Sequence, residues 1–293
     1  MRQVARPGNR PGAWFDIRAA PGTEPMDGLL HRILTAKRAE TLRRKSETPE
    51  AELTRRIADL DRPRNFFQAV TRESDKPLHL IAEIARASPS AGVNREDFDP
   101  VAVARAYDAG GASALSVVTD GPFFRGSLDD LRRVRAAVAL PVLRKDFILE
   151  AWQVYESRAA GADGILLVAE ALPTNELIDL QILATELHMT CLIEVHGMDA
   201  LIRVRDAVIG FPHRSYSLLV ISNRDPDTFH PDLKTTLRLA ELVEDKRVLV
   251  SEGGISTRDD VAKLADAGVR AMIVGETLLR EPDVTQATRL LLA

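Results

Sequence analysis

Residues 190–196 read TCLIEVH, an apolar run that carries a carboxylate near its end. A short run of aliphatic and β-branched residues is typical of a strand buried on both faces of a parallel sheet. Similar runs recur from residue 79 onward, and longer amphipathic stretches separate them. In chain order the eight runs are 79–85, 114–119, 141–147, 164–170, 190–196, 217–222, 247–252 and 271–276. Their spacing of roughly 25–30 residues is what one strand, one helix and two short loops require.

The stretches between these runs have helical spacing. Examples are residues 99–111 (DPVAVARAYDAGG), 128–138 (LDDLRRVRAAV) and 257–269 (TRDDVAKLADAGV). Glycine comes at the end of the first and last, as it does at many helix C-termini. Eight strand–helix units close most economically as a barrel, whereas a doubly wound sheet usually stops at about five to seven strands. We therefore predict an α/β protein in which residues 79–293 form a (β/α)8 TIM barrel.

The residues before the barrel fall into two parts. Residues 1–26 are rich in Pro and Gly and are expected to form a flexible leader. Residues 27–78 are expected to form an N-terminal helical extension packed on the barrel. A second helical stretch within it, residues 46–70, carries Phe66 and Phe67, which we expect to anchor it to the barrel. In the first helix, apolar residues share one face and Arg and Lys the other; the apolar residues are Leu29, Leu30, Ile33, Leu34, Ala36 and Leu42.

Charge and composition restrict the partners. A net charge of −4 and a pI near 5.9 argue against nucleic acid, because binding it needs a concentrated basic patch. No run is long enough to span a bilayer, so we expect a cytoplasmic protein without a membrane partner. The histidines and the single Cys191 show no metal-binding spacing, so no metal site is expected. Cys191 is expected to be a buried core residue rather than a nucleophile.

The predicted strands end on ionisable or hydroxyl side chains, and strand C-terminal ends form the active-site mouth of this architecture. The end residues are Glu83, Thr119, Lys145, Glu170, Glu194, Ser222, Glu252 and, after Gly275, Glu276. For Glu170 alone, a first solvated residue after a strand is as good an explanation as a functional one. That explanation is weaker for Glu83, Lys145 and Glu194, because apolar residues follow each of them. A lysine among carboxylates in a partly dry mouth suits general acid and base chemistry.

Two further segments favour a phosphate site. Residues 251–257 (SEGGIST) and 274–279 (VGETLL) place glycine and a hydroxyl residue just after the last two strands and before a helix. Glycine lets backbone N–H groups approach an anion, and phosphate sites of TIM barrels commonly occupy this place. Ordinary strand-to-helix turns also favour glycine, but two consecutive matches favour phosphate.

Taken together, these motifs resemble the indole-3-glycerol-phosphate synthase family. The matching segments are AEIARASPSAG, TDGPFFRGSLDDL, PVLRKDFI, LIEVH, NRD, SEGGI and VGETLL, in the family's order and spacing within residues 27–292. The resemblance implies a carboxy-lyase of tryptophan biosynthesis, which cyclises carboxyphenylamino-deoxyribulose phosphate with loss of carbon dioxide and water. It implies general acid/base catalysis without a cofactor or metal, in a monomer or weak homodimer.

The resemblance also implies roles for particular residues. Lys145 would be the general acid that protonates the substrate carbonyl oxygen, and Glu194 its partner base or acid in the dehydration. Glu83 and Glu252 would orient Lys145 and stabilise a cationic intermediate. Substrate would be bound by Glu252, Ser222, Arg224, Phe124 and Phe147, the two phenylalanines flanking its aromatic ring. Phosphate would be held by Ser88, Gly254, Gly275 and the backbone amide of Glu276.

Several positions depart from the family's pattern. Ala85 stands where a lysine for the substrate carboxylate is expected, Ser222 stands for an asparagine, and Gly253 stands for a serine. Val220 replaces a glycine and is expected to narrow the space beside the substrate. Each lost charged contact typically costs about 2–4 kcal/mol of transition-state stabilisation. Two alternatives therefore stay open: a divergent enzyme for another ribulose phosphate, and a non-catalytic barrel that binds phosphate and docks a partner through its basic N-terminal helix.

Overall fold

Eight parallel strands close into a barrel in the computed structural model, which describes residues 28–89, 92–210, 217–225, 228 and 230–293. Each strand pairs with the next barrel strand along the chain, and the last pairs with the first. The barrel strands are β1 (His79–Ile84), β4 (Ala114–Val118), β5 (Val142–Lys145), β6 (Gly164–Val168), β7 (Thr190–Val195), β8 (Ser217–Ser222), β9 (Leu249–Glu252) and β10 (Ala271–Val274). Each lies within one of the eight predicted runs, so the predicted barrel is confirmed.

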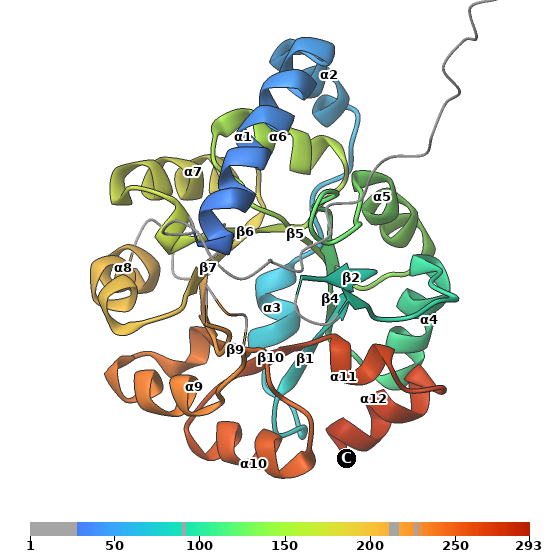
Figure 1. The fold of residues 1–293 in the computed structure, drawn as a ribbon, viewed down its shortest axis with the longest axis vertical. Helices are drawn as coiled ribbons and strands as arrows, with labels where there is room; N and C mark the ends of the chain where they lie inside the picture. Colours follow the sequence, from blue (N-terminus) through green and yellow to red (C-terminus); the bar gives the residue numbers. More distant parts are fainter. Residues whose placement is uncertain (1–27, 90–91, 211–216, 226–227, 229) are drawn as a thin grey trace, which may run out of the picture.

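Helices surround the barrel (Figure 1). They are α4 (Pro100–Gly110), α5 (Leu128–Ala137), α6 (Ala151–Ala159), α7 (Thr174–Glu186), α8 (Met198–Gly210), α9 (Lys234–Leu239), α10 (Arg258–Asp266), α11 (Glu276–Leu279) and α12 (Val284–Leu292), with the 3-10 turns η1 (Ala169–Ala171), η3 (Ala240–Leu242) and η4 (Lys246–Val248). Local signals explain their ends. Thr257 and Asp260 form a capping box at the start of α10. Gly111 ends α4 with a φ of 95°, which glycine adopts without strain.

Alternation along the strands divides the core into two layers. Leu80, Cys191 and Ile193 belong to the apolar layer between the strands and the outer helices, whereas Ile81 and Leu192 belong to the cluster that fills the barrel. Successive residues of a strand point to opposite faces, so every second residue faces the barrel axis. Cys191 is fully buried, as expected, and burial raises the pKa of its thiol.

Between residue 28, where the described chain begins, and the barrel lie three helices: α1 (Leu29–Glu47), α2 (Glu50–Ala58) and α3 (Phe66–Thr71). The predicted second helical stretch is therefore two helices, and the side chain of Asn65 caps the second of them. Phe66 is fully buried in the barrel cluster and Phe67 packs against it, which confirms both as anchors. In Figure 1, α2 lies beside α6.

The predicted faces of α1 are wrong at two positions. Leu42 is 72% exposed, whereas Lys37 is only 3% exposed. The period of 3.6 residues explains both: Lys37 is three and four residues beyond the buried Leu34 and Ile33, and Leu42 is turned away from that face. A charged residue therefore lies in the middle of the buried face of α1.

A small antiparallel pair, β2 (Ala87–Ser88) and β3 (Gly92–Val93), follows β1 and was not predicted. The expected leader at residues 1–26 lies outside the described residues. Within the part of the chain that the structure describes, no helix is long and apolar enough to cross a membrane.

Candidate active site

The alternation of the strands brings the predicted catalytic side chains to one end of the barrel. Leu192 faces the barrel interior, so Glu194, two residues later, faces it as well. The same step of two leads from other interior residues to other site residues: from Ile81 to Glu83, from Leu143 to Lys145, from Val220 to Ser222 and from Val250 to Glu252. Each pair ends at the C-terminal end of its strand, and the five polar side chains line one cavity of about 110 Å³.

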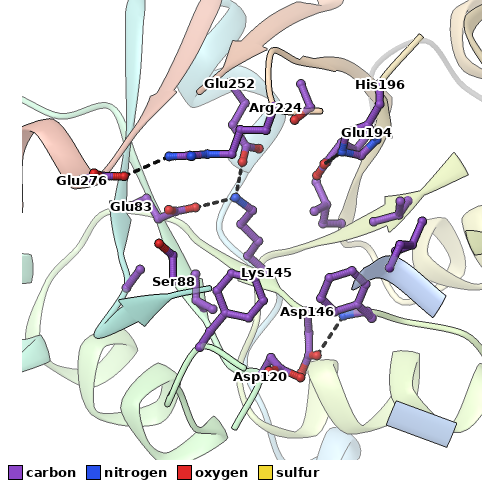
Figure 2. Close-up of a pocket in the computed structure, with 18 of the residues that line it drawn as sticks. Glu83, Ser88, Asp120, Lys145, Asp146, Glu194, His196, Arg224, Glu252 and Glu276 are labelled. Carbon is purple, nitrogen blue, oxygen red and sulfur yellow. Dashed lines mark hydrogen bonds and ion pairs between the residues drawn. The ribbon is translucent and has the colours of Figure 1, made fainter. Parts of the chain in front are cut away.

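Lys145 lies between two carboxylates (Figure 2). Its Nζ atom is 2.6 Å from Oε2 of Glu83, and it also pairs with Oε1 of Glu252. Burial alone would lower the pKa of Lys145, but Glu252, Glu83 and Glu194 together raise it well above its usual value. The ammonium group therefore keeps its proton at neutral pH, as a general acid must before it reacts.

The pKa of Glu252 is also raised, which in a carboxyl group favours the neutral form. Burial and the neighbouring Glu194 and Glu83 raise its pKa to about 7, against the lowering effect of Lys145. Its Oε2 atom is buried and has no hydrogen-bond partner among the described residues. This carboxyl group can therefore exchange a proton near neutral pH.

Glu194 faces a histidine that the sequence reasoning missed. Nε2 of His196 is 2.9 Å from Oε1 of Glu194, and Nδ1 is 3.1 Å from Oε2 of Glu170. Burial opposes ionisation of Glu194, but His196, Lys145 and a hydrogen bond from Ser222 lower its pKa. Burial likewise opposes the charge on His196, yet hydrogen bonds and attraction from both glutamates raise its pKa to about 10. The signal for His196 was its position in TCLIEVH, two residues after Glu194 and thus on the same face.

Two phenylalanines line the same cavity. The rings of Phe124 and Phe147 are 6.3 Å apart at their centroids and are tilted by 38°. Leu30 of α1 also lines the cavity, so the N-terminal extension contributes to its wall. The cavity thus has an apolar side next to its charged centre, as a site for an aromatic group requires.

The predicted phosphate residues lie at the edge of the cavity and in a groove that adjoins it. Ser88 and Glu276 line the cavity, and Gly254, Gly275 and Glu276 line the groove. The Glu276 carboxylate accepts a hydrogen bond from Arg224 at 3.1 Å and forms an ion pair with Arg280 at 3.0 Å. A Cβ atom on Gly275 would lie 2.9 Å from Cβ of Glu83, so only glycine fits between this turn and the side chain of Glu83.

The positions that depart from the family's pattern surround the same site. Ala85 and Ser222 are buried and line the cavity, and Gly253 lines the groove with a φ of 86°. Val220 packs in the barrel cluster below Ser222 and does not line the cavity, so the expected narrowing at the substrate is wrong.

A second buried charge cluster, which the sequence reasoning also missed, holds α1 beside the site. Nζ of Lys37 is 2.8 Å from Oδ1 of Asp146 and 2.9 Å from Oδ2 of Asp120. Asp146 also accepts a hydrogen bond from the fully buried Arg144 at 3.0 Å. Both aspartates line the cavity, and Asp146 directly follows Lys145 in the chain. α1 is therefore part of the support of the site.

Among the described residues, no group of three or more His, Cys, Asp or Glu side chains is arranged to hold a metal ion. Lys145, Glu194 and Glu252 line one cavity, where their side chains can exchange protons beside an apolar wall.

Comparisons with known proteins show which sequences and structures this chain is similar to. The family model "Indole-3-glycerol phosphate synthase" matches residues 30–291. Proteins of that name from Rhodopirellula baltica and Rhodospirillum rubrum are each 44% identical to this chain, over 90% and 91% of its length and 99% and 100% of theirs. A solved structure of a thiamine phosphate pyrophosphorylase from Pyrococcus furiosus overlaps 73% of this chain and 94% of its own, with a TM-score of 0.53 and 18% identity. That likeness shows the fold alone.

Proposed function

The chain belongs to the indole-3-glycerol phosphate synthase family, and from this premise we propose that it catalyses the lyase reaction of tryptophan biosynthesis. Its substrate is carboxyphenylamino-deoxyribulose phosphate, and its products are indole-3-glycerol phosphate, carbon dioxide and water. The observation that carries the proposal is the position of Lys145 between Glu83 and Glu252, with Glu194 facing the same cavity.

Ring closure is the first step. The aromatic carbon that bears the carboxylate attacks the carbonyl carbon of the sugar chain, and Lys145 gives its proton to the carbonyl oxygen. Glu83 and Glu252 fix the ammonium group and stabilise the positive charge that develops on the ring and nitrogen. Departure of carbon dioxide returns the bonding electron pair to the ring.

Dehydration completes the indole. The new hydroxyl group takes a second proton and leaves as water, while Glu194 removes one proton from the adjacent methylene carbon. Two protons are added and one is removed, so each turnover takes one proton from solvent. Glu252, with a pKa near 7, is suited to pass such a proton on.

The remaining residues bind the substrate. Phe124 and Phe147 flank its aromatic ring, and Ser222 and Arg224 contact its polar chain. Ser88, Gly254, Gly275 and the backbone amide of Glu276 hold the phosphate, with Arg224 and Arg280 supplying nearby positive charge. The enzyme acts in the cytoplasm, as a monomer or a weak homodimer.

The test is indole-3-glycerol phosphate formation, followed by product fluorescence with the authentic substrate. The purified chain is compared with Lys145→Met, which removes the proposed acid and serves as the blank, and with Ala85→Lys. Turnover by the unaltered chain, lost in Lys145→Met, supports the proposal. No turnover above the blank refutes it. Activity that appears only in Ala85→Lys assigns the scaffold to the family and the present chain to another task.

Ala85 favours one second candidate function, in which the substrate is a related ribulose phosphate without the aromatic carboxylate. The reason is that Ala85 stands where a lysine for that carboxylate is expected. The cationic side chains that line the cavity in the described residues each face carboxylates: Lys145 faces Glu83 and Glu252, and His196 faces Glu194 and Glu170; Arg224 faces Glu276. Assays with the decarboxylated substrate analogue discriminate, because turnover of that analogue alone supports the second candidate.

A further inference from the structure

Three side chains from two neighbouring strand ends form a row that leads out of the cavity. Glu194 ends the inward face of β7, His196 follows it by two residues, and Glu170 lies in η1 directly after β6. Their side chains are 8%, 13% and 24% exposed in that order. The row therefore runs from the proposed base in the interior to a carboxylate at the rim.

Glu170 holds the histidine at two points. Its Oε1 atom accepts a hydrogen bond from the backbone N–H of His196 at 2.8 Å, and its Oε2 atom lies 3.1 Å from Nδ1 of the ring. These two contacts fix both the start of the loop and the rotation of the imidazole. Nε2 is then directed at Oε1 of Glu194, 2.9 Å away.

The partners of the ring decide its charge. Ionised carboxylates only accept hydrogen bonds, and a neutral imidazole has a single N–H to donate. Both ring nitrogens face a carboxylate oxygen, so both contacts are satisfied only when the ring is an imidazolium. Such a ring presents a fixed positive charge to Glu194.

We infer that Glu170 and His196 are a positioning pair for the proposed reaction: Glu170 fixes His196 as an imidazolium, and His196 orients the Glu194 carboxylate and keeps it ionised. Neither residue is required to exchange a proton with substrate. The inference rests on the proposed function, since it assigns Glu194 as the base. Among the described residues, the other charged groups that act on Glu194 are Lys145 from β5 and Glu252 from β9.

Two variants separate charge from hydrogen bonding. In Glu170→Gln, the amide can still accept the backbone N–H of His196, but its NH2 group donates to Nδ1. The ring then keeps one proton on Nε2 and loses its charge. His196→Gln removes the ring altogether. Glu176→Gln makes the same chemical change at an exposed position of α7 and is the matched control.

The first measurement is the pH dependence of kcat with the authentic substrate. The acidic limb, where Glu194 takes up a proton, should move to higher pH by about one unit in Glu170→Gln and His196→Gln. KM at neutral pH should change less than kcat, and Glu176→Gln should match the unaltered chain. An unmoved acidic limb in both site variants overturns the inference.

The second measurement needs no turnover, so it stands even where the proposed function fails. Nitrogen-15 NMR of labelled histidine, assigned with His196→Gln, reports which ring nitrogens carry protons. We expect both nitrogens of His196 to be protonated at pH 8 in the unaltered chain and only one in Glu170→Gln. A neutral ring at pH 8 in the unaltered chain overturns the inference.

Discussion

Replacing Lys37 by methionine should destabilise the protein strongly, although the residue lies in a helix outside the barrel. The substitution keeps most of the side-chain length and removes the ammonium group that faces Asp120 and Asp146. Removal of one partner from a buried ion pair typically costs about 3–5 kcal/mol, because the remaining charge stays buried without compensation. Domains of this size lose about 2–4 °C of Tm per kcal/mol, so Tm should fall by roughly 6–20 °C.

The matched control is Lys45→Met. Lys45 is on the same helix and pairs with Glu150 at 2.6 Å, but the two side chains are 43% and 40% exposed. Such a pair is worth less than about 1 kcal/mol. Thermal and urea unfolding, followed by circular dichroism, should therefore separate the two variants clearly.

The pH dependence gives a second check. Burial alone would raise the pKa of Asp146, but Lys37 and Arg144 hold it well below its usual range. A carboxylate with a lowered pKa adds stability above its unfolded-state pKa and loses it as the pH falls through the folded value. Without Lys37 that pKa rises, so the deficit of Lys37→Met should be largest near pH 7 and should shrink toward pH 4. A Lys37→Met variant as stable as Lys45→Met at pH 7, or a deficit that does not change with pH, would refute this reasoning.

Three further outcomes are expected. Gly275→Ala should lower kcat at least about 10-fold, because its Cβ atom would displace Glu83, whereas Gly197→Ala has open space and should be nearly silent in the same fluorescence assay. Lys145→Met should lower turnover at least about 100-fold with its circular dichroism spectrum unchanged; activity within a few-fold of the unaltered chain would remove Lys145 from the acid role. The pKa of His196 is raised to about 10, so protonated His196 stabilises the folded state. This contribution to the free energy of unfolding is fully present below the unfolded-state pKa, near 6.5, and is lost as the pH rises toward 10. Urea unfolding should therefore show that the free energy of unfolding falls between pH 7 and pH 10, and that it falls less in His196→Gln. An equal fall in the two proteins would contradict this prediction.

The barrel could be predicted because its signals are local. Each strand is a short apolar run between turn residues, and every second residue of a strand faces the barrel axis. Glu83, Lys145, Glu194 and Glu252 could therefore be assigned to one end of the barrel. The same rule applied to one more residue would have found His196. It does not reach the partner of His196, because Glu170 comes from another strand end and its side chain looks like an ordinary solvated glutamate in the sequence.

Lys37 was misplaced for a different reason. A rule that assigns charged residues to the solvated face of a helix fails where the barrel supplies counter-charges, and Asp120 and Asp146 are far from Lys37 in the sequence.

The split of the second helical stretch into α2 and α3 had a visible signal in the sequence, since Pro63 and the capping Asn65 lie at the break.

The contact between α1 and the strand-end aspartates sets a rule for anyone who builds chimaeras from this protein. A cut between the extension and β1 looks safe in the sequence, because both halves keep their own apolar residues. Such a graft would pair this barrel with a foreign helix. Unless that helix carries a cation at the position of Lys37, Asp120 would lose its ion pair with Lys37, and Asp146, the residue after Lys145, would keep only Arg144 of its two cationic partners. Helix and barrel therefore have to be exchanged as one module.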